Sequence, residues 1–218
     1  MIFPIGDEQI QGGYKPIFSY SFIGLNIALF FYELFMNSTG QLDIFIENYG
    51  AIPIEIKSGQ DLHTLFTNMF LHGGWMHLIG NMLFLWIFAD NIEATIGNFR
   101  FLLFYIAGGI IASLVHVAFN LDSVVPSIGA SGAISAVLGA YLVMFPKSRV
   151  KILVIYIFSS FYVSAFIFLG FWIVFQLFNG FSSMGQNINS GGVAYWAHIG
   201  GFAFGMFYGF WARKNYYK

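Results

Sequence analysis

The sequence predicts an all-α integral membrane protein, built as a bundle of six transmembrane helices with both termini on the cytoplasmic side. Charged residues make up only 9% of the 218 positions, whereas an ordinary globular protein has about 25%. Apolar residues reach 58%, including 28 Phe, 12 Tyr and 5 Trp, which is more apolar surface than a soluble chain of this length can bury. The apolar segments and the distribution of Lys and Arg then predict the number and direction of the helices.

Six apolar segments approach the length of about 20 residues that a helix needs to cross a bilayer. They cover residues 17–36, 75–96, 99–119, 130–145, 152–178 and 194–211. The first 14 residues carry Asp7 and Glu8 but no basic region, so we expect no cleavable signal peptide and a first segment that stays as a membrane helix. No internal repeat is evident, and residues 1–218 are expected to form one membrane domain.

The basic residues orient the helices, because Lys and Arg concentrate in cytoplasmic loops. With both termini inside, only Lys57 of the 9 Lys and Arg residues lies on the outer side. The residues on the inner side are Lys15, Arg100, Lys147, Arg149, Lys151, Arg213, Lys214 and Lys218. The second, fourth and sixth segments therefore run from the outer to the inner face of the membrane.

Composition also excludes several classes of function. A formal net charge of -1 excludes nucleic-acid binding driven by phosphate contacts. The lack of Cys excludes disulfides, iron–sulfur clusters and thiol nucleophiles. The sequence has no His-Glu-x-x-His motif, which excludes the zinc-dependent type of intramembrane protease. We expect neither a metal nor another cofactor.

Polar residues lie near the outer starts of the even-numbered segments, where such side chains are costly and by default mark function. They are His72, His77 and Asn81 at the second segment, Gly129-Ala130-Ser131-Gly132 at the fourth, and His198 in the sixth. A helix rises 1.5 Å per residue, which places Ser131, His198 and Asn81 about 22–24 Å from the inner ends of their segments. In a hydrocarbon core about 30 Å thick, all three occupy one recessed level near the outer surface.

Small residues on the fourth and sixth segments would let these two helices approach closely. They recur at every fourth position, as Ser131, Ser135 and Gly139 and as Gly201, Gly205 and Gly209. Such stripes also occur in ordinary membrane packing. That explanation does not account for a Ser and a His at the same depth on these two helices.

Together these motifs resemble the rhomboid family of intramembrane serine proteases. The Gly-x-Ser-Gly motif around Ser131, the Ala197-His198 pair followed by Gly201 and Gly205, and His77 separated by three residues from Asn81 match that family in order and in helix. The resemblance extends from about Leu62 to the end of the chain and implies a rhomboid-like six-helix fold.

The resemblance implies that Ser131 is the nucleophile and that His198 is its general base, which later protonates the leaving amine. The Asn81 amide, the His77 ring and the Ser131 backbone N–H would stabilise the oxyanion. No carboxylate is expected at this depth, because Asp90 and Glu93 lie near the inner end, so we expect a catalytic pair rather than a triad. Supporting roles are expected for the other motif residues, His72, Gly129, Gly132, Gly201 and Gly205.

Further expectations concern the surroundings of the pair. Residues 179–192 are expected to form a flexible lid, and residues 36–67 a long outer loop. His116 is expected to be structural, and His63 to be solvated in the outer loop. Two positions depart from the family. Ser135 stands where many members have an aromatic residue that stacks on the catalytic His, and His63-Thr64 stand where many have Trp-Arg.

The aromatic residues of the fifth segment leave two interpretations open. They form either a mobile wall beside the path of a membrane substrate, past the second and fifth helices, or a surface that faces lipid. These residues are Phe158, Phe161, Phe166, Phe168, Phe171 and Trp172.

The function implied is that of a serine endopeptidase that cleaves membrane proteins in or near their transmembrane segments. We expect a bacterial cytoplasmic membrane, an active site open to the outer side, and transmembrane substrates and lipid, not nucleic acid, as partners. The alternative is an inactive rhomboid-like protein that binds membrane clients without cutting them. A haem-binding cytochrome could pair His77 with His198 but would leave the Ser131 motif unexplained.

Overall fold

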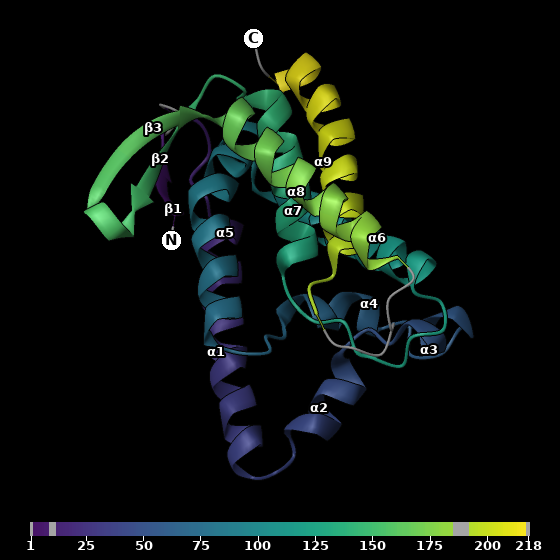
Figure 1. Cartoon of the computed structure of the whole chain (residues 1–218). Coiled ribbons are helices and arrows are strands. Elements are labelled where there is room, and N and C mark those ends of the chain that lie inside the picture. Colours follow the sequence, from purple (N-terminus) through teal and green to yellow (C-terminus); the bar gives the residue numbers. More distant parts are fainter. Residues whose placement is uncertain (1, 9–11, 185–191, 217–218) are drawn as a thin grey trace.

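The computed structural model describes residues 2–8, 12–184 and 192–216 and consists mainly of long helices (Figure 1). A long helix occupies all or part of each of the six predicted segments. These helices are α1 (Phe18–Ser38), α5 (Trp75–Ile96), α6 (Asn98–Phe119), α7 (Ser131–Met144), α8 (Ala165–Ser183) and α9 (Tyr195–Tyr216). Among the described residues, α1, α6 and α8 are long and apolar enough to cross a membrane, and α7 is a shorter apolar helix. The structure therefore agrees with a helical membrane bundle, while the count of six spans stays a prediction.

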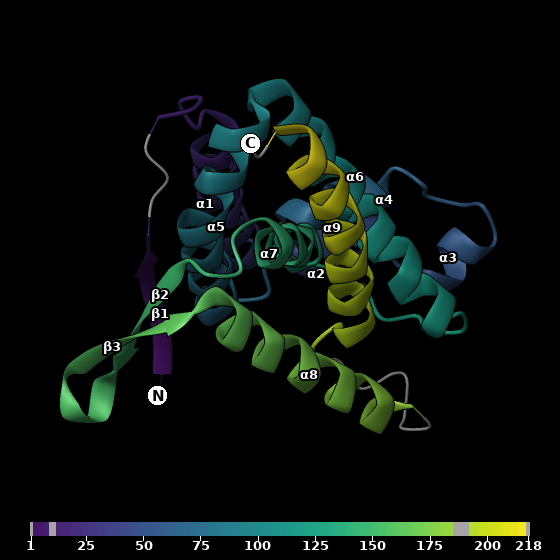
Figure 2. The ribbon, with the colours of Figure 1, turned by 90° about the horizontal axis from the view of Figure 1, so that it is seen from above.

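Helix α7 lies at the centre of the bundle, between α5, α8 and α9 (Figure 2). Of its 14 residues, 12 are buried, which requires small side chains wherever another helix touches it. Against α9 the two backbones are in direct contact, since a Cβ atom on Gly201 or Gly205 would overlap the backbone oxygen of Gly132 or Ala136, respectively. The two small-residue stripes therefore face each other across the α7–α9 contact.

The segment between α1 and α5 is not the long loop predicted for residues 36–67. It folds into α2 (Leu42–Tyr49), α3 (Pro53–Lys57), α4 (Thr64–Thr67) and the 3₁₀ helix η1 (Asn68–Phe70). This layer supports the chain just before α7. Ala51 and Ser127 form an antiparallel bridge, and the Gly129 N–H donates to the Asn68 carbonyl at 2.8 Å.

The two residues that depart from the family's Trp-Arg pair help to hold this layer together. The ring Nε2 of His63 lies 3.2 Å from the Asn48 carbonyl oxygen, and the Thr64 hydroxyl donates to the Asp61 carbonyl at 2.7 Å. His63 is exposed, as expected, and it also joins α2 to the start of α4.

The fifth predicted segment is wrong over its first half. A hairpin of β2 (Arg149–Val154) and β3 (Ser159–Ser164), joined by the 3₁₀ turn η2 (Ile155–Ile157), precedes α8, which begins only at Ala165. The hairpin residues are mostly β-branched or aromatic, types that favour strands. Apolar content alone does not separate a strand from a buried or membrane helix.

A further strand, β1 (Ile2–Asp7), pairs antiparallel with β2 and completes a sheet in the order β1-β2-β3. Asp7 anchors this strand to the bundle, because it accepts hydrogen bonds from the Tyr141 hydroxyl of α7 and from the Asn91 amide of α5. Beyond the strand, Arg149 donates to the Glu8 carboxylate at 2.7 Å and lowers the pKa of that carboxyl. Pro4 and Gly6 weaken the strand pattern of this segment, which the sequence did not predict.

Candidate active site

Ser131 is the first residue of α7. Gly129, two residues earlier, has a φ of +126°, a conformation that residues with a side chain rarely adopt. The turn at Gly129 ends the preceding loop, and α7 starts two residues later. Ser131, at this start, lines a cavity. Because Ser131 is in the first turn, its backbone N–H has no acceptor within the helix.

His198 lies in the first turn of α9 and is only 8% exposed. Its ring nitrogen Nε2 is 2.8 Å from the Ser131 hydroxyl oxygen. Its other ring nitrogen, Nδ1, is 2.9 Å from the side-chain oxygen of Gln176 on α8. The Ser and the His that the sequence placed at one depth are thus in hydrogen-bond contact, although they belong to different helices.

Two residues contact the His198 ring in a way that the sequence did not predict. One is Gln176, and the other is Trp172, whose ring centroid lies 5.8 Å from that of His198 at an interplanar angle of 35°. Both belong to α8 and lie one helical turn apart. Ser135 does not support the ring, because its hydroxyl donates to the Ser131 carbonyl at 2.6 Å. A buried Gln one turn after a Trp in an apolar helix was the available signal.

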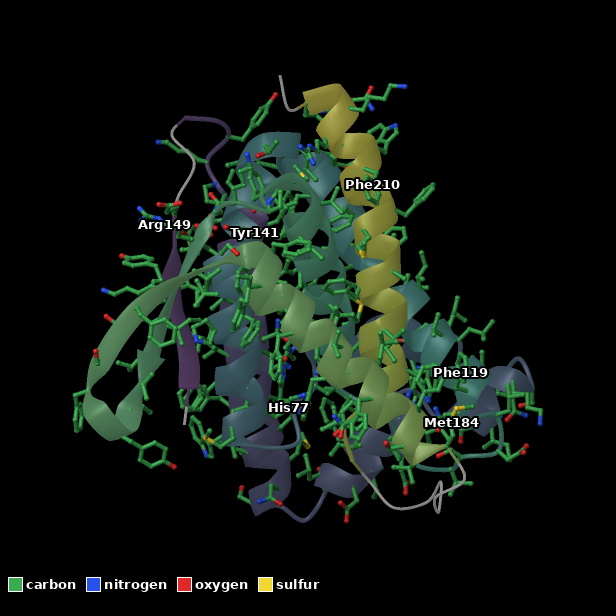
Figure 3. All side chains as sticks on the ribbon, turned by 45° about the horizontal axis from the view of Figure 1, so that its top comes forward. His77, Phe119, Tyr141, Arg149, Met184 and Phe210 are labelled. Carbon is green, nitrogen blue, oxygen red and sulfur yellow. The ribbon has the colours of Figure 1, made fainter. Side chains whose placement is uncertain are left out.

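His77 and Asn81 of α5 line the same cavity as Ser131 and His198. Figure 3 shows His77 toward the end of the bundle that lies opposite Tyr141 and Arg149. A Cβ atom at Gly129 would lie 2.6 Å from His77 Nε2 and 3.7 Å from Asn81 Nδ2. Gly129 therefore leaves room for these two side chains beside the start of α7.

His72 contacts Asn81, with 3.0 Å between its Nε2 and the Asn81 amide nitrogen. Its backbone N–H donates to the Glu33 carboxylate of α1 at 3.0 Å and 3.2 Å. Burial, together with the nearby His77, lowers the pKa of His72 to about 4. The prediction that no carboxylate lies near this level is therefore corrected, although Glu33 bonds to the loop of His72 and not to His198.

The cavity has a volume of about 860 Å³ and is lined from α5, α6, α7, α8 and α9 and from the loops before α7 and α9. His116, predicted to be structural, lines it together with Asn120, whose amide donates to the His116 carbonyl at 2.8 Å. The predicted lid begins later than expected, because α8 continues to Ser183, and residues 185–191 lie outside the described residues. Within the described part of the chain, no group of three or more His, Asp or Glu residues could hold a metal ion.

The aromatic residues of α8 fall into two groups, those that stack on α5 and those that are exposed. Phe168 stacks on Phe84 and Phe88 of α5, with ring centroids 6.2 Å apart in both pairs. Phe166 and Phe171 are 63% and 75% exposed, on the outer surface of the helix. One face of α8 thus packs against α5, and the opposite face points away from the bundle.

Of the glycines given supporting roles, Gly129 and Gly132 flank the Ser131 turn, and Gly201 and Gly205 lie in the α7–α9 contact. With this geometry in view, comparison with known proteins identifies the fold: the model of the Rhomboid domain matches residues 59–215. The chain belongs to the rhomboid family.

Two rhomboid relatives cover most of this chain. The Rhomboid protease GluP of Bacillus subtilis is 36% identical over 193 residues, which are 88% of this chain and 34% of GluP. Rhomboid protein 1, mitochondrial, of Saccharomyces cerevisiae is 28% identical over 202 residues, which are 89% of this chain and 53% of the yeast protein. The chain thus spans about a third and about half of these two relatives.

A shorter match links the chain to a second Bacillus subtilis protein, named Putative rhomboid protease YdcA, at 42% identity over 81 residues. These residues are 37% of this chain and 40% of YdcA. The rhomboid family consists of helical integral membrane proteins, and the apolar helices of this chain agree with that placement.

Proposed function

We propose that this rhomboid protein is an intramembrane serine endopeptidase that uses Ser131 and His198 as a catalytic pair. The observation that carries the proposal is the 2.8 Å contact between the Ser131 hydroxyl and His198 Nε2, in a cavity that His77 and Asn81 also line. The name of the relative GluP, a rhomboid protease, supports the same activity.

The first chemical step follows from this geometry. A serine hydroxyl is a weak nucleophile and needs an adjacent base. His198 Nε2 takes the proton of Ser131 as the oxygen attacks the scissile carbonyl carbon, and an acyl-enzyme forms when the peptide C–N bond breaks. The imidazolium returns this proton to the leaving amine. Water then hydrolyses the ester in the same way, with His198 again as the base.

The oxyanion is stabilised from two sides of the cavity. The Ser131 backbone N–H lies at the positive end of α7, where the helix dipole favours negative charge. The Asn81 amide carries two N–H donors, and a contact with His72 orients it. His77 reaches the space that Gly129 leaves open. Each donor of this kind contributes about 3–4 kcal/mol to transition-state stabilisation in serine proteases.

The substrates that fit this site are transmembrane segments of other membrane proteins, which reach the cavity laterally past α5 and α8. All six long helices would span the bilayer, with both termini in the cytoplasm and the cavity open to the outer side. A bacterial cytoplasmic membrane is the proposed location.

The positions of the basic residues support this orientation. Asn98 donates to the Lys15 carbonyl at 2.8 Å, the Arg100 guanidinium lies 5.1 Å from the Tyr216 ring, and Arg213 donates to the end of α7. Through these contacts, Lys15, Arg100 and Arg213 lie near the proposed inner ends of α5, α7 and α9. Lys57, the expected outer exception, pairs with Asp122 beside the cavity-side loops. Lys218 lies outside the described residues.

The runner-up is an inactive rhomboid-like protein that binds membrane clients. It predicts a missing or misplaced catalytic group, whereas Ser131 and His198 are both present and in hydrogen-bond contact. The protease is therefore the better supported function.

Reaction with a fluorophosphonate probe in detergent tests the proposal. Wild type is expected to be labelled, and Ser131→Ala and His198→Ala are not. The matched control is Ser160→Ala, which changes an exposed serine of β3 and should be labelled like wild type. Asn81→Ala should fold but cleave a transmembrane substrate about 100-fold more slowly or worse. Equal labelling of wild type and Ser131→Ala would refute the protease and leave the client-binding alternative.

A further inference from the structure

We propose that Gln176 is a positioning residue that holds His198 in the ring orientation and tautomer that the reaction needs. This inference rests on the proposed function of Ser131 and His198. It adds a neutral third member to the pair, supplied by α8, whereas the sequence analysis expected only two residues.

Gln176 is buried on a helix whose neighbouring positions face outward. It is 6% exposed, whereas Val174 and Phe175 beside it are 61% and 51% exposed. A polar side chain in such a place is costly unless it is hydrogen-bonded. Its side-chain oxygen lies 2.9 Å from His198 Nδ1, and this bond satisfies the amide oxygen at the point where α8 faces α9.

The contact determines which ring nitrogen carries the proton. An amide oxygen can only accept a hydrogen bond, so Nδ1 of His198 carries the hydrogen and donates to Gln176. In the neutral ring, Nε2 then has the free lone pair and accepts the hydrogen bond from the Ser131 hydroxyl. The opposite tautomer would place an N–H against the serine and leave the ring without basicity at Nε2. In serine proteases of the triad type an aspartate has this task.

Trp172 supports the same ring from its face. Its ring lies 5.8 Å from the His198 ring and 5.8 Å from the Phe202 ring. Gln176 thus holds the edge of the imidazole at Nδ1, while Trp172 limits its tilt. Both side chains come from α8, which explains how the ring is held although Ser135 stands at the position of the family's stacking aromatic residue.

An amide differs from a carboxylate in one way that can be measured. It orients the ring without adding a negative charge, so it stabilises the imidazolium less than a carboxylate would. Replacing Gln176 by Glu keeps an acceptor at Nδ1 and adds that charge. Replacing it by Leu keeps the volume roughly constant and removes the acceptor. The two variants therefore separate hydrogen bonding from packing.

The experiment measures cleavage of a transmembrane substrate by the full chain in detergent, at a series of pH values, for wild type, Gln176→Leu and Gln176→Glu. We expect Gln176→Leu to lower kcat by about tenfold, as for the loss of one such hydrogen bond, with KM little changed. Gln176→Glu should recover part of the lost kcat and move the acidic limb of the kcat/KM profile to higher pH. The matched control is Asn179→Ala, since the Asn179 amide donates only to the Phe175 carbonyl on the same helix, and it should retain wild-type kcat.

A second readout does not depend on activity. Nitrogen-15 NMR of histidine-labelled protein reports the protonated ring nitrogen, and the His198 signal is assigned by its loss in His198→Asn. Wild type should show hydrogen on Nδ1, and Gln176→Leu a mixture of tautomers. An unchanged tautomer and a kcat within twofold of wild type in Gln176→Leu would overturn the role of Gln176. If Gln176→Leu fails to fold, the pH profile of Gln176→Glu decides, and an unshifted acidic limb would overturn it.

Failure of the proposed function would look different. In that case wild type and Ser131→Ala react equally with the fluorophosphonate probe. If instead wild type reacts with the probe, Ser131→Ala does not, and the Gln176 variants have wild-type activity, the catalytic pair is supported and the positioning role of Gln176 is refuted.

Discussion

The contact between α7 and α9 and the packing of α8 against both represent two different ways of holding a catalytic group. Between α7 and α9 the backbones touch at Gly201 and Gly205, so neither helix can move without separating main-chain atoms. By contrast, only 22% of the most apolar stretch of α8 is buried inside the protein. This helix contacts the His198 ring through two side chains, Gln176 and Trp172.

Each of these two regions therefore controls a different feature of the site geometry. The distance between the Ser131 oxygen and His198 Nε2 depends on the backbone contact of α7 with α9. The rotation of the His198 ring depends on α8. Because α8 also stacks on α5 through Phe168, a substrate that entered between α5 and α8, as proposed, would also act on the helix that contacts the His198 ring.

The largest effect is expected from breaking the α7–α9 contact with Gly205→Ala. The added Cβ atom would overlap the Ala136 backbone oxygen, and backbone cannot yield as a flexible side chain does. Overpacking of this kind costs about 1–3 kcal/mol or more, and we expect loss of fluorophosphonate labelling together with a lower thermal midpoint in detergent. Normal labelling would show that the catalytic distance does not depend on this contact.

Acid is expected to affect the loop before α5, because His72 in that loop is buried next to other titratable groups. The pKa of His72 is about 4 in the folded protein, against an ordinary value of 6.5, and Glu33 and His77 face it. A lowered His pKa gives stability that is fully present above pH 6.5 and is lost as the pH falls toward 4. At pH 5 the loss from this one group is about 2 kcal/mol.

Thermal midpoints measured at pH 7.5 and pH 5 check this prediction. His72→Gln retains an acceptor for Asn81 but does not titrate, so its midpoint should fall less than that of wild type between these two pH values. A fall of the same size in both proteins would assign the pH dependence to other groups.

A smaller effect is expected from Trp172→Leu, which leaves the α7–α9 contact intact and loosens the His198 ring. An aromatic contact contributes about 0.5–1.5 kcal/mol beyond its buried area, so the labelling rate should fall about two- to tenfold, with the fold preserved. Trp86→Leu changes a tryptophan of α5 that is 52% exposed and serves as the matched control. Equal rates in the two variants would remove Trp172 from the support of His198.

The smallest effect is expected from Gly170→Ala on α8. A Cβ atom there has no neighbour within 4 Å, and alanine favours a helix over glycine by up to about 1 kcal/mol. The labelling rate should be that of wild type, and the thermal midpoint equal or slightly higher. Comparison with Gly205→Ala shows how much more tightly the backbone is packed at Gly205 than at Gly170. A severe defect in Gly170→Ala would mean that α8 is packed as tightly as α9.

What the sequence predicted well depended on patterns within one segment. The apolar runs located all or part of the six long helices, and the helical rise placed Ser131 and His198 at one depth, where the structure brings them into contact. The family resemblance, placed from about Leu62 onward, is confirmed by the domain match over residues 59–215.

What it missed depended on contacts between segments. Strand β1 forms because β2 offers it a partner, and the hairpin displaces a helix because Val, Ile and Tyr fit both structures. The sequence did not point to Gln176 or Glu33, since their partners, His198 Nδ1 and the His72 backbone, are set by how helices pack and not by spacing along the chain.

The division of the reactive pair between α7 and α9 also bears on how the protein is made. Ser131 and His198 are 67 positions apart, and α9 is synthesised after α7. On the proposed function, Ser131 has no base until α9 docks against α7, so a nascent chain with only α7 in the membrane would not yet cleave peptide bonds. The glycines that allow this docking would then also determine when the reactivity begins.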